Sequence, residues 1–539
     1  MDSILYDTLS LEPNGSNDIH GCRPAGKTRH GRLSQTTDTR FSSLPLWLGL
    51  LIFSFLIQLV ANYDSPLHTY YRKLDCAWFF MGGKALMNGF IPYSDFADSK
   101  GPLVWLFYGI GYLISPKSFI GVYVLHAILY SFIFYWAYRT AFELFASTAD
   151  IAKRKWMSVS TSLLLALPFF TYGHIEMRCE DLCQLPLIYC IYRLIRCVRD
   201  PESSTDFKSA VIMGVSIACT LMIKWNIAVL MSAIPLSILV MAYRHKLPTK
   251  SLTAGTAIGF VAVIVPIVIA FALVGGLRTF VNEYFFHTAQ TFSSSLTESI
   301  SNYLRELHEA LTSRGLIGFA TMFVPLYFFH SFGRRKYLPV MCGLVMFLGL
   351  TYRCGFGYYH SGYVAWMVFL SALIVKAIFS IGICHNKTVT AAIALCTSAV
   401  LSAYVIRNHR NWIWNDETKP FIEMESKLSG LEKPTILNWE YFEYAVGTSA
   451  ETLPACRYWA EQTNAQSFSR GPQLAAVKAR IPDIITVQSH DAGIIHPDKQ
   501  STLDSLNYQY IGSVADLFGL SCNIYIKEEL TPLLNHMPH

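Results

Sequence analysis

The sequence predicts an α-helical polytopic membrane protein with a small α/β domain at its C-terminal end. Apolar residues make up 52% of the 539 residues and charged residues only 15%, so the chain carries far more apolar side chain than a soluble core of this size needs. The apolar residues gather in runs of about 17 to 25, long enough as helices to cross a hydrocarbon layer about 30 Å thick. These long runs end near residue 406, and the rest of the chain has only short apolar segments.

About eleven of these runs are predicted to span the membrane. The polar residues 1–45 contain no apolar stretch resembling a cleavable signal, so we expect them to be disordered and cytoplasmic. With that start, every turn predicted on the inner side is basic, as the positive-inside rule requires. This topology accounts for the net charge of +6, and we infer no nucleic-acid partner from it. The predicted spans are 46–62, 119–145, 157–171, 182–198, 208–223, 227–243, 252–275, 315–331, 338–352, 361–383 and 388–406.

The apolar stretch 102–115 allows two topologies. As a span it would place the basic residues 153–155 outside, and at about 14 residues it is short for a crossing. As a helix in or near the outer interface it leaves those basic residues in the cytoplasm. We prefer the second topology, which makes 63–118 a long outer loop that contains interfacial helices.

The region after the last span has the pattern of a small α/β domain. Short apolar segments at 435–437, 483–487 and 523–527 are typical of strands, and 451–462 has a helical pattern. Cys456 and Cys522 would both face outward, where an oxidising compartment would allow a disulfide, and the sequence leaves this pairing open. The predicted domains are a cytoplasmic segment (1–45), a transmembrane domain (46–406) and an extracytoplasmic α/β domain (407–539).

Charged residues of the first outer loop are the main candidates for chemistry. Asp75 opens a helical pattern, Asp95 and Asp98 flank an aromatic turn, and Lys100 directly precedes the next apolar stretch. A carboxylate held beside the bilayer can accept a proton from a hydroxyl, and a nearby ammonium can bind a phosphate. The structural alternative is that Asp75 caps its helix and Lys100 extends to the lipid headgroups.

Further charges are expected near the outer boundary. Glu180 lies where an outer turn re-enters the membrane, although an acid at a helix start also stabilises the helix dipole without any function. Lys224 lies in a short turn between two spans, where an ammonium must find water, phosphate or a carboxylate. Arg353, Tyr359 and His360 follow an apolar span, and each alone is explained equally well as an interfacial anchor. Their convergence on one side of the membrane favours a functional site.

An ordered set of these residues resembles the GT-C superfamily of membrane glycosyltransferases. The nearest resemblance is to the bacterial enzymes related to protein O-mannosyltransferases and the lipid A aminoarabinose transferase. It covers 46–406 in architecture, and only 75–106 carries a specific motif. The set consists of Asp75, the run G-x-x-P-Y-x-D-F-x-D-x-K-G-P from Gly89 to Pro102, Glu180, Lys224, and the pair Tyr359 and His360.

The resemblance implies transfer of a sugar from a polyprenyl-phosphate donor to a hydroxyl of a glycan, lipid or protein acceptor. The site and the C-terminal domain would face the periplasm of a bacterium, with the chain in the inner membrane among its lipids. Asp75 would be the general base and Lys100 would bind the carrier phosphate, with Gly101 standing where the similar K-P-P run has its first proline. A divalent metal is compatible with the acids, but no ligand set requires one. The resemblance also implies that Glu180 holds the second acidic position of the catalytic site and positions acceptor or sugar. The other implied roles are Lys224, Arg353 and His360 as phosphate contacts, and Asp95, Asp98 and Tyr359 as positioning residues for acceptor or sugar.

Two other classes of protein fit parts of the pattern. A transporter or flippase of a lipid-linked sugar would use the same outer charges as a gate, and a noncatalytic scaffold would use its C-terminal domain to bind a partner. A transporter is expected to carry ionisable residues near the bilayer centre on several helices. Here the charges gather at the ends of the spans, which favours chemistry at the membrane surface.

Overall fold

The structure is a computed structural model, and it describes most of the chain after residue 43. The chain divides into the units Met1–Pro45 and Leu46–His539. Nearly all of the cytoplasmic segment predicted at the N-terminus lies outside the described residues. The described residues are 44–62, 64–67, 74–171, 178–287, 296–313, 315–352, 357–382, 385–413, 419–441, 446–461, 466–515 and 520–534.

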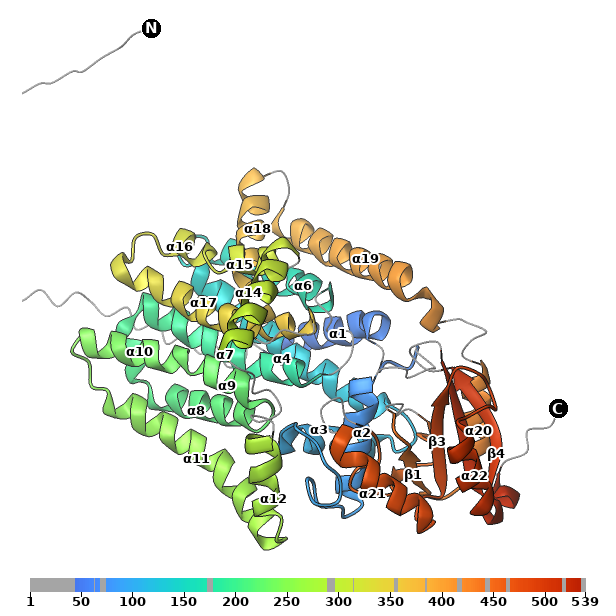
Figure 1. Ribbon diagram of the computed structural model, residues 1–539. Helices are drawn as coiled ribbons and strands as arrows, with labels where there is room; N and C mark the ends of the chain where they lie inside the picture. Colours follow the sequence, from blue (N-terminus) through green and yellow to red (C-terminus); the bar gives the residue numbers. More distant parts are fainter. Residues whose placement is uncertain are drawn as a thin grey trace, which may run out of the picture. The chain divides into compact units, whose positions relative to one another are not determined.

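Most of the described residues before the C-terminal sheet lie in helices (Figure 1). The first ones are α1 (Leu44–Ala61), α2 (Leu74–Met87), α3 (Pro102–Ile114), α4 (Ile120–Leu144), α5 (Ile151–Leu164), α6 (Ala166–Thr171), α7 (Cys179–Arg199), η1 (Pro201–Thr205), α8 (Phe207–Leu221), α9 (Trp225–Met231), α10 (Ala233–Arg244) and α11 (Lys250–Leu273). They are followed by α12 (Leu277–Val281), η2 (Asn282–His287), α14 (Leu296–Thr312), α15 (Gly315–Thr321), α16 (Val324–Phe328), η3 (Gly333–Lys336), α17 (Tyr337–Thr351), η4 (Gly357–Met367), α18 (Val368–Ile381) and α19 (Asn386–Ile413).

Six helices within the described ranges are long and apolar enough to cross a membrane. The pair Thr297–Thr312 and Gly315–Phe328, bent by 84°, would add a seventh if it forms one span. Several predicted spans are shorter or interrupted here: 157–171 is divided between α5 and α6, and 208–223 is the 15-residue α8. The count of about eleven therefore stays a prediction. The six are Leu44–Ala61, Ile120–Leu144, Trp225–Arg244, Lys250–Leu273, Ser361–Ile381 and Asn386–Tyr404.

The first outer loop contains the two short helices that the sequence predicted. The 13 residues of α3 reach about 20 Å at 1.5 Å per residue, too short for a hydrocarbon layer of about 30 Å. α3 packs tightly against α2, because a Cβ built on Gly83 would lie 2.4 Å from the backbone nitrogen of Gly109. The pair therefore forms one compact hairpin, which carries Asp75 and the run that contains Lys100.

Polar contacts between apolar helices fix how α1, α4 and α7 lie together. Ser54 of α1 donates to the Ala127 carbonyl of α4 (2.8 Å), and Tyr130 of α4 donates to Asp181 of α7 (3.0 Å). At the other end of the same two helices, Glu143 of α4 forms an ion pair with Arg199 of α7 (2.9 Å). α4 and α7 thus run parallel, and their C-terminal ends meet on the side predicted to be cytoplasmic.

The C-terminal region is a five-stranded mixed sheet in the order β2-β1-β3-β5-β4, with helices packed on it (Figure 1). β1 pairs in parallel with β2 and β3, whereas β5 pairs antiparallel with β3 and β4. Alternate residues of β3 belong to two apolar clusters: Ile484 to the one that contains Met424 of α20, and Ile485 to the one that contains Val477 of α21. The elements are α20 (Lys419–Leu428), β1 (Thr435–Asn438), β2 (Leu453–Pro454), α21 (Gln466–Lys478), β3 (Ile484–Ser489), α22 (Pro497–Ser505), β4 (Tyr508–Ala515), β5 (Ser521–Lys527) and η6 (Glu528–Leu533).

This sheet confirms the three predicted strands and corrects the predicted helix. The segment 451–461 contains β2 and turns, and the next helix begins at Gln466. Pairing of the Leu453 and Ala455 N–H groups with carbonyls of the neighbouring strand outweighs the local helical pattern. Cys456 and Cys522 are not joined by a disulfide, and the buried Cys522 lies 2.6 Å from the Tyr441 hydroxyl.

The segment 451–461 also docks onto the first outer loop. Trp459 stacks on Trp78 of α2, with ring centroids 4.6 Å apart, and the Ala97 N–H donates to the Arg457 carbonyl (2.9 Å). Tyr112 of α3 donates to Glu451 (2.8 Å). The C-terminal domain therefore supports the loop that carries the candidate site.

One lysine of this contact is fully buried. Lys84 of α2 is 1% exposed and lies 3.5 Å from the Thr452 hydroxyl. Burial lowers its pKa to about 7, against the opposing charges of Glu425 and Glu451. Burial also raises the pKa of Glu425, although backbone and side-chain hydrogen bonds from Ser449 oppose this. Folding therefore shifts Lys84, at the contact between α2 and the segment 451–461, towards its neutral form.

The lowered pKa of Lys84 predicts that the free energy of unfolding depends on pH. Between about pH 7 and the ordinary lysine pKa of 10.5, the unfolded chain holds a proton that the folded chain lacks, so stability rises with pH in this window. Lys84→Met is expected to remove a slope of up to about 1.4 kcal/mol per pH unit, measured as thermal unfolding in detergent. The exposed Lys433→Met is the control and should keep the wild-type slope. Equal slopes for wild type and Lys84→Met would contradict this account.

Candidate functional site

Asp75 lies in the first turn of α2 and faces the start of α7. Its carboxylate is 3.9 Å from the Arg178 guanidinium, and its side chain is 39% exposed. Arg178 directly precedes α7 and is held there, because its backbone N–H donates to Asp181 (2.8 Å). The pairing orients an accessible carboxylate without enclosing it, as a base that must reach a substrate requires.

Glu180 and Lys224 form a buried ion pair beside Asp75. Glu180 lies in the first turn of α7, and Lys224 directly precedes α9, with the two side chains in hydrogen-bond contact. Both are mostly removed from water. A buried charge requires a partner, so each of the two holds the other in its ionised form and in a fixed place.

Lys100 is the most accessible cation of the group. Its side chain is 31% exposed, with the ammonium 3.9 Å from Asp98 and 5.9 Å from the Phe79 ring centroid. The Lys100 N–H also donates to Asp98 (2.9 Å), and the buried Tyr93 donates to the Lys100 carbonyl (2.6 Å). The backbone of Lys100 is thus fixed while its ammonium can reach an incoming anion.

Gly101 links the segment that carries Lys100 to the turn that carries Lys224. Its N–H donates to the Ile223 carbonyl (3.1 Å), which places the residue after Lys100 against the residue before Lys224. A Cβ built on Gly101 would lie 2.0 Å from the Met222 carbonyl oxygen, so no side chain fits here. This explains the glycine at the position where the similar K-P-P run has a proline, since proline would also lack the N–H.

Cys179 marks the centre of the group. Its thiol is buried and interacts electrostatically with four of the charged residues that the sequence singled out. The structure therefore brings together residues from α2, the run before α3, the start of α7 and the turn before α9. These residues are Asp75, Lys100, Glu180 and Lys224. We call them the charge cluster.

The remaining predicted site residues have other surroundings. Asp98 is buried and accepts from Trp78 and from the Lys100 backbone, so it supports Lys100. Asp95 is exposed and accepts from the Ile91 N–H (2.6 Å), which closes its own turn. Arg353 lies outside the described residues. Tyr359 and His360 fall in η4, where only the backbone is described.

Two contributors to the site were not assigned a role from the sequence. Arg178 lies two positions before Glu180, but its pairing with Asp75 joins segments far apart in the chain and is invisible in the sequence. Trp459 supports Trp78, which donates to Asp98, and so connects the C-terminal domain to Lys100. In the part of the chain that the structure describes, no three His, Cys, Asp or Glu side chains gather as a metal site.

Gly101 gives a test of this arrangement. Gly101→Ala is expected to push the lysine run away from Met222 and to destabilise the fold by about 1–3 kcal/mol, as overpacking does. The thermal midpoint in detergent measures this effect. Gly471→Ala is the control, because nothing lies within 4 Å of a Cβ at that position. If the Gly101→Ala protein is as stable as wild type, Gly101 does not lie this close to the Met222 carbonyl.

The helices, the short helices of the first loop and the C-terminal sheet together give this chain the GT-C fold of membrane glycosyltransferases, which confirms the resemblance seen in the sequence. One similar structure is that of ArnT from Cupriavidus metallidurans bound to undecaprenyl phosphate (TM-score 0.56, 10% identity, 92% of this chain and 100% of that one). The apo state of the same protein gives a TM-score of 0.55 at 10% identity, over 92% of this chain and 99% of that one.

A third structure is more distant. The Archaeoglobus fulgidus oligosaccharyltransferase, tethered with an acceptor peptide, has a TM-score of 0.45 and 12% identity, over 83% of this chain and 70% of that one. No protein-family model and no curated protein sequence matches this chain. At this level of identity the similarity to these structures is one of fold, and the residues of this chain that bear on its chemistry are those of the charge cluster.

Proposed function

We propose that this chain is a membrane glycosyltransferase that moves a sugar from a polyprenyl-phosphate donor to a hydroxyl of a glycan, lipid or protein acceptor. The observation that carries the proposal is the charge cluster, which sets an accessible carboxylate and an accessible ammonium around one buried ion pair. The ArnT structure of the same fold holds undecaprenyl phosphate, which supports a lipid phosphate as the donor class. The active site and C-terminal domain would face the periplasm, with the chain in a bacterial inner membrane.

In this mechanism Asp75 removes the proton of the acceptor hydroxyl. The hydroxyl oxygen then forms a bond to the anomeric carbon of the sugar, and the bond from that carbon to the phosphate oxygen breaks. The polyprenyl phosphate leaves with the electron pair, so the leaving group needs cations more than it needs an acid. Lys100 binds the departing phosphate, and Arg178 holds Asp75 in the orientation needed for proton transfer.

The Glu180–Lys224 pair has a different part in this mechanism. Because Glu180 is buried with Lys224, it fixes that ammonium in a turn whose backbone contacts the segment that carries Lys100. We infer that the two positive charges face one phosphate. Holding donor and acceptor together in the interface contributes much of the remaining rate increase. The predicted phosphate contacts Arg353 and His360, and the positioning residue Tyr359, belong to the same proposal.

A transfer assay on the purified full-length chain in proteoliposomes tests the proposal. Lipid that copurifies with the protein is first identified by mass spectrometry, since its head group names the donor sugar. Labelled donor of that kind is then supplied with membrane extract as the source of acceptors. Sugar covalently attached to an acceptor, with release of polyprenyl phosphate, is the expected result. Movement of intact donor across the bilayer with no covalent product would contradict the proposal and favour a flippase.

A further inference from the structure

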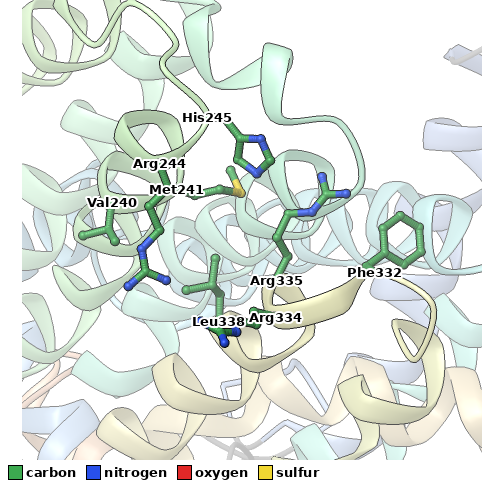
Figure 2. Close-up of a pocket in the computed structure, with 8 residues that line it drawn as sticks. All are labelled: Val240, Met241, Arg244, His245, Phe332, Arg334, Arg335 and Leu338. Carbon is green, nitrogen blue, oxygen red and sulfur yellow. The ribbon is translucent and has the colours of Figure 1, made fainter.

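A cavity of about 380 Å³ lies between the end of α10 and the start of α17, away from the charge cluster. Arg244 and His245 contribute from the end of α10, and Arg334 and Arg335 from η3, just before α17. Figure 2 shows these basic side chains arranged around the same space, with Met241 between them. Basic residues from two separate elements therefore frame one pocket.

The cations of this pocket lack acidic partners in the part of the chain that the structure describes. None of the three arginines forms an ion pair with a described carboxylate, and Arg335 lies over the Phe332 ring, 5.7 Å from its centroid. A basic inner turn needs only positive charge near the membrane surface. Three guanidinium groups lining one cavity, unneutralised by described acids, go beyond that need and suit an anionic group such as a phosphate.

The pocket continues into apolar surface along both helices. Its wall includes Val240 and Leu338, which are not charged. From it, exposed apolar side chains run along α17 at Tyr337, Met341 and Val345, at the spacing of one helix face. A matching stripe on α10 consists of Leu236, Val240 and Tyr243. An occupant with a charged head and long apolar tails fits this surface, whereas a free phosphate leaves both stripes unused.

This pocket lies at the opposite end of a span from the charge cluster. The span Trp225–Arg244 begins next to Lys224 and ends at Arg244, and its 20 residues correspond to about 30 Å of helix. The two sites therefore lie on opposite membrane surfaces, whichever surface is cytoplasmic. The pocket cannot serve as the donor site of the proposed reaction, and this inference does not depend on that reaction.

We propose that the pocket binds the headgroup of an anionic glycerophospholipid, with the acyl chains lying along α10 and α17. The arginines hold the phosphate by charge-assisted hydrogen bonds, and the exposed stripes cover the tails. By the positive-inside pattern, this lipid comes from the inner leaflet.

Native mass spectrometry of the full-length protein measures this binding. Delipidated protein in detergent is titrated with phosphatidylglycerol or with phosphatidylcholine. The triple variant Arg244→Gln, Arg334→Gln, Arg335→Gln is expected to bind phosphatidylglycerol about tenfold more weakly or worse, and to bind phosphatidylcholine unchanged. The control variant Lys153→Gln, Lys155→Gln, Lys208→Gln loses the same number of charges from α5 and α8, outside the cavity, and should bind as wild type does.

Two further measurements keep the proposal testable if the triple variant does not fold. A photoactivatable phosphatidylglycerol on wild-type protein should crosslink to peptides from α10 and from 332–345. Inorganic phosphate at millimolar concentration should not displace the lipid. Equal phosphatidylglycerol binding by the triple variant, crosslinks confined to other helices, or displacement by phosphate alone would each overturn the proposal, the last in favour of a simple anion site.

Discussion

Asp75→Asn is expected to lower the rate of sugar transfer by about 10²- to 10⁴-fold, the range that a positioned general base contributes. Asparagine keeps the size of the side chain but cannot accept the proton of the acceptor hydroxyl. Because Asp75 is partly exposed and paired with Arg178 at 3.9 Å, its loss should leave the fold and the membrane insertion intact. The initial rate of transfer from labelled donor in proteoliposomes measures the effect.

The controls for Asp75 separate catalysis from folding. Glu202→Gln removes an exposed carboxylate in the turn η1, outside the charge cluster, and should keep the full rate. The thermal midpoint of Asp75→Asn should stay close to that of wild type. If Asp75→Asn retains the wild-type rate, Asp75 is not the base, and the proton must go to another acceptor.

Lys224→Met is expected to destabilise the protein by about 3–5 kcal/mol, because it leaves the buried Glu180 without its cation. The double variant Lys224→Met, Glu180→Leu should recover most of that stability, since neither buried charge remains. It should not recover sugar transfer, because the second cation of the proposed phosphate site is still missing. Unfolding in detergent and the transfer rate, measured on the same three proteins, separate the structural part of the pair from the functional part.

Two outcomes would contradict this reading of the pair. A single variant Lys224→Met as stable as wild type would mean that Glu180 is not buried against this lysine. A double variant with the wild-type transfer rate would mean that the pair supports the fold alone. Rescue of stability without rescue of transfer is the result that the proposed function requires.

Hydropathy and charge were sufficient to predict the fold class and several elements. The short first-loop helices were predicted because 102–115 is too short to cross and the residues 153–155 are basic. The number of spans was harder to predict, since α5 ends at Leu164 and α6 starts at Ala166 within one apolar run. The helix predicted over 451–462 failed because strand pairing, a contact with a distant segment, overrode the local pattern.

The sequence identified the charge cluster by residue type but not by its contacts. Asp75 and Glu180 stood out as acids near the membrane boundary, yet their partners Arg178 and Lys224 are set by how α2, α7 and α9 pack. Gly101 looked like a departure from the similar K-P-P run. Its requirement became clear only with the Met222 carbonyl in contact, which no pattern within one segment contains.

Binding of a polyprenyl phosphate is the most direct test of the charge cluster as a lipid-phosphate site. The measurement is the affinity of detergent-purified protein for undecaprenyl phosphate, for wild type and for Lys100→Met. We predict saturable binding by wild type and binding about tenfold weaker or worse in the variant, which loses a charge-assisted hydrogen bond. Equal affinity of the two proteins would contradict the central claim that this cluster receives the phosphate of a lipid carrier.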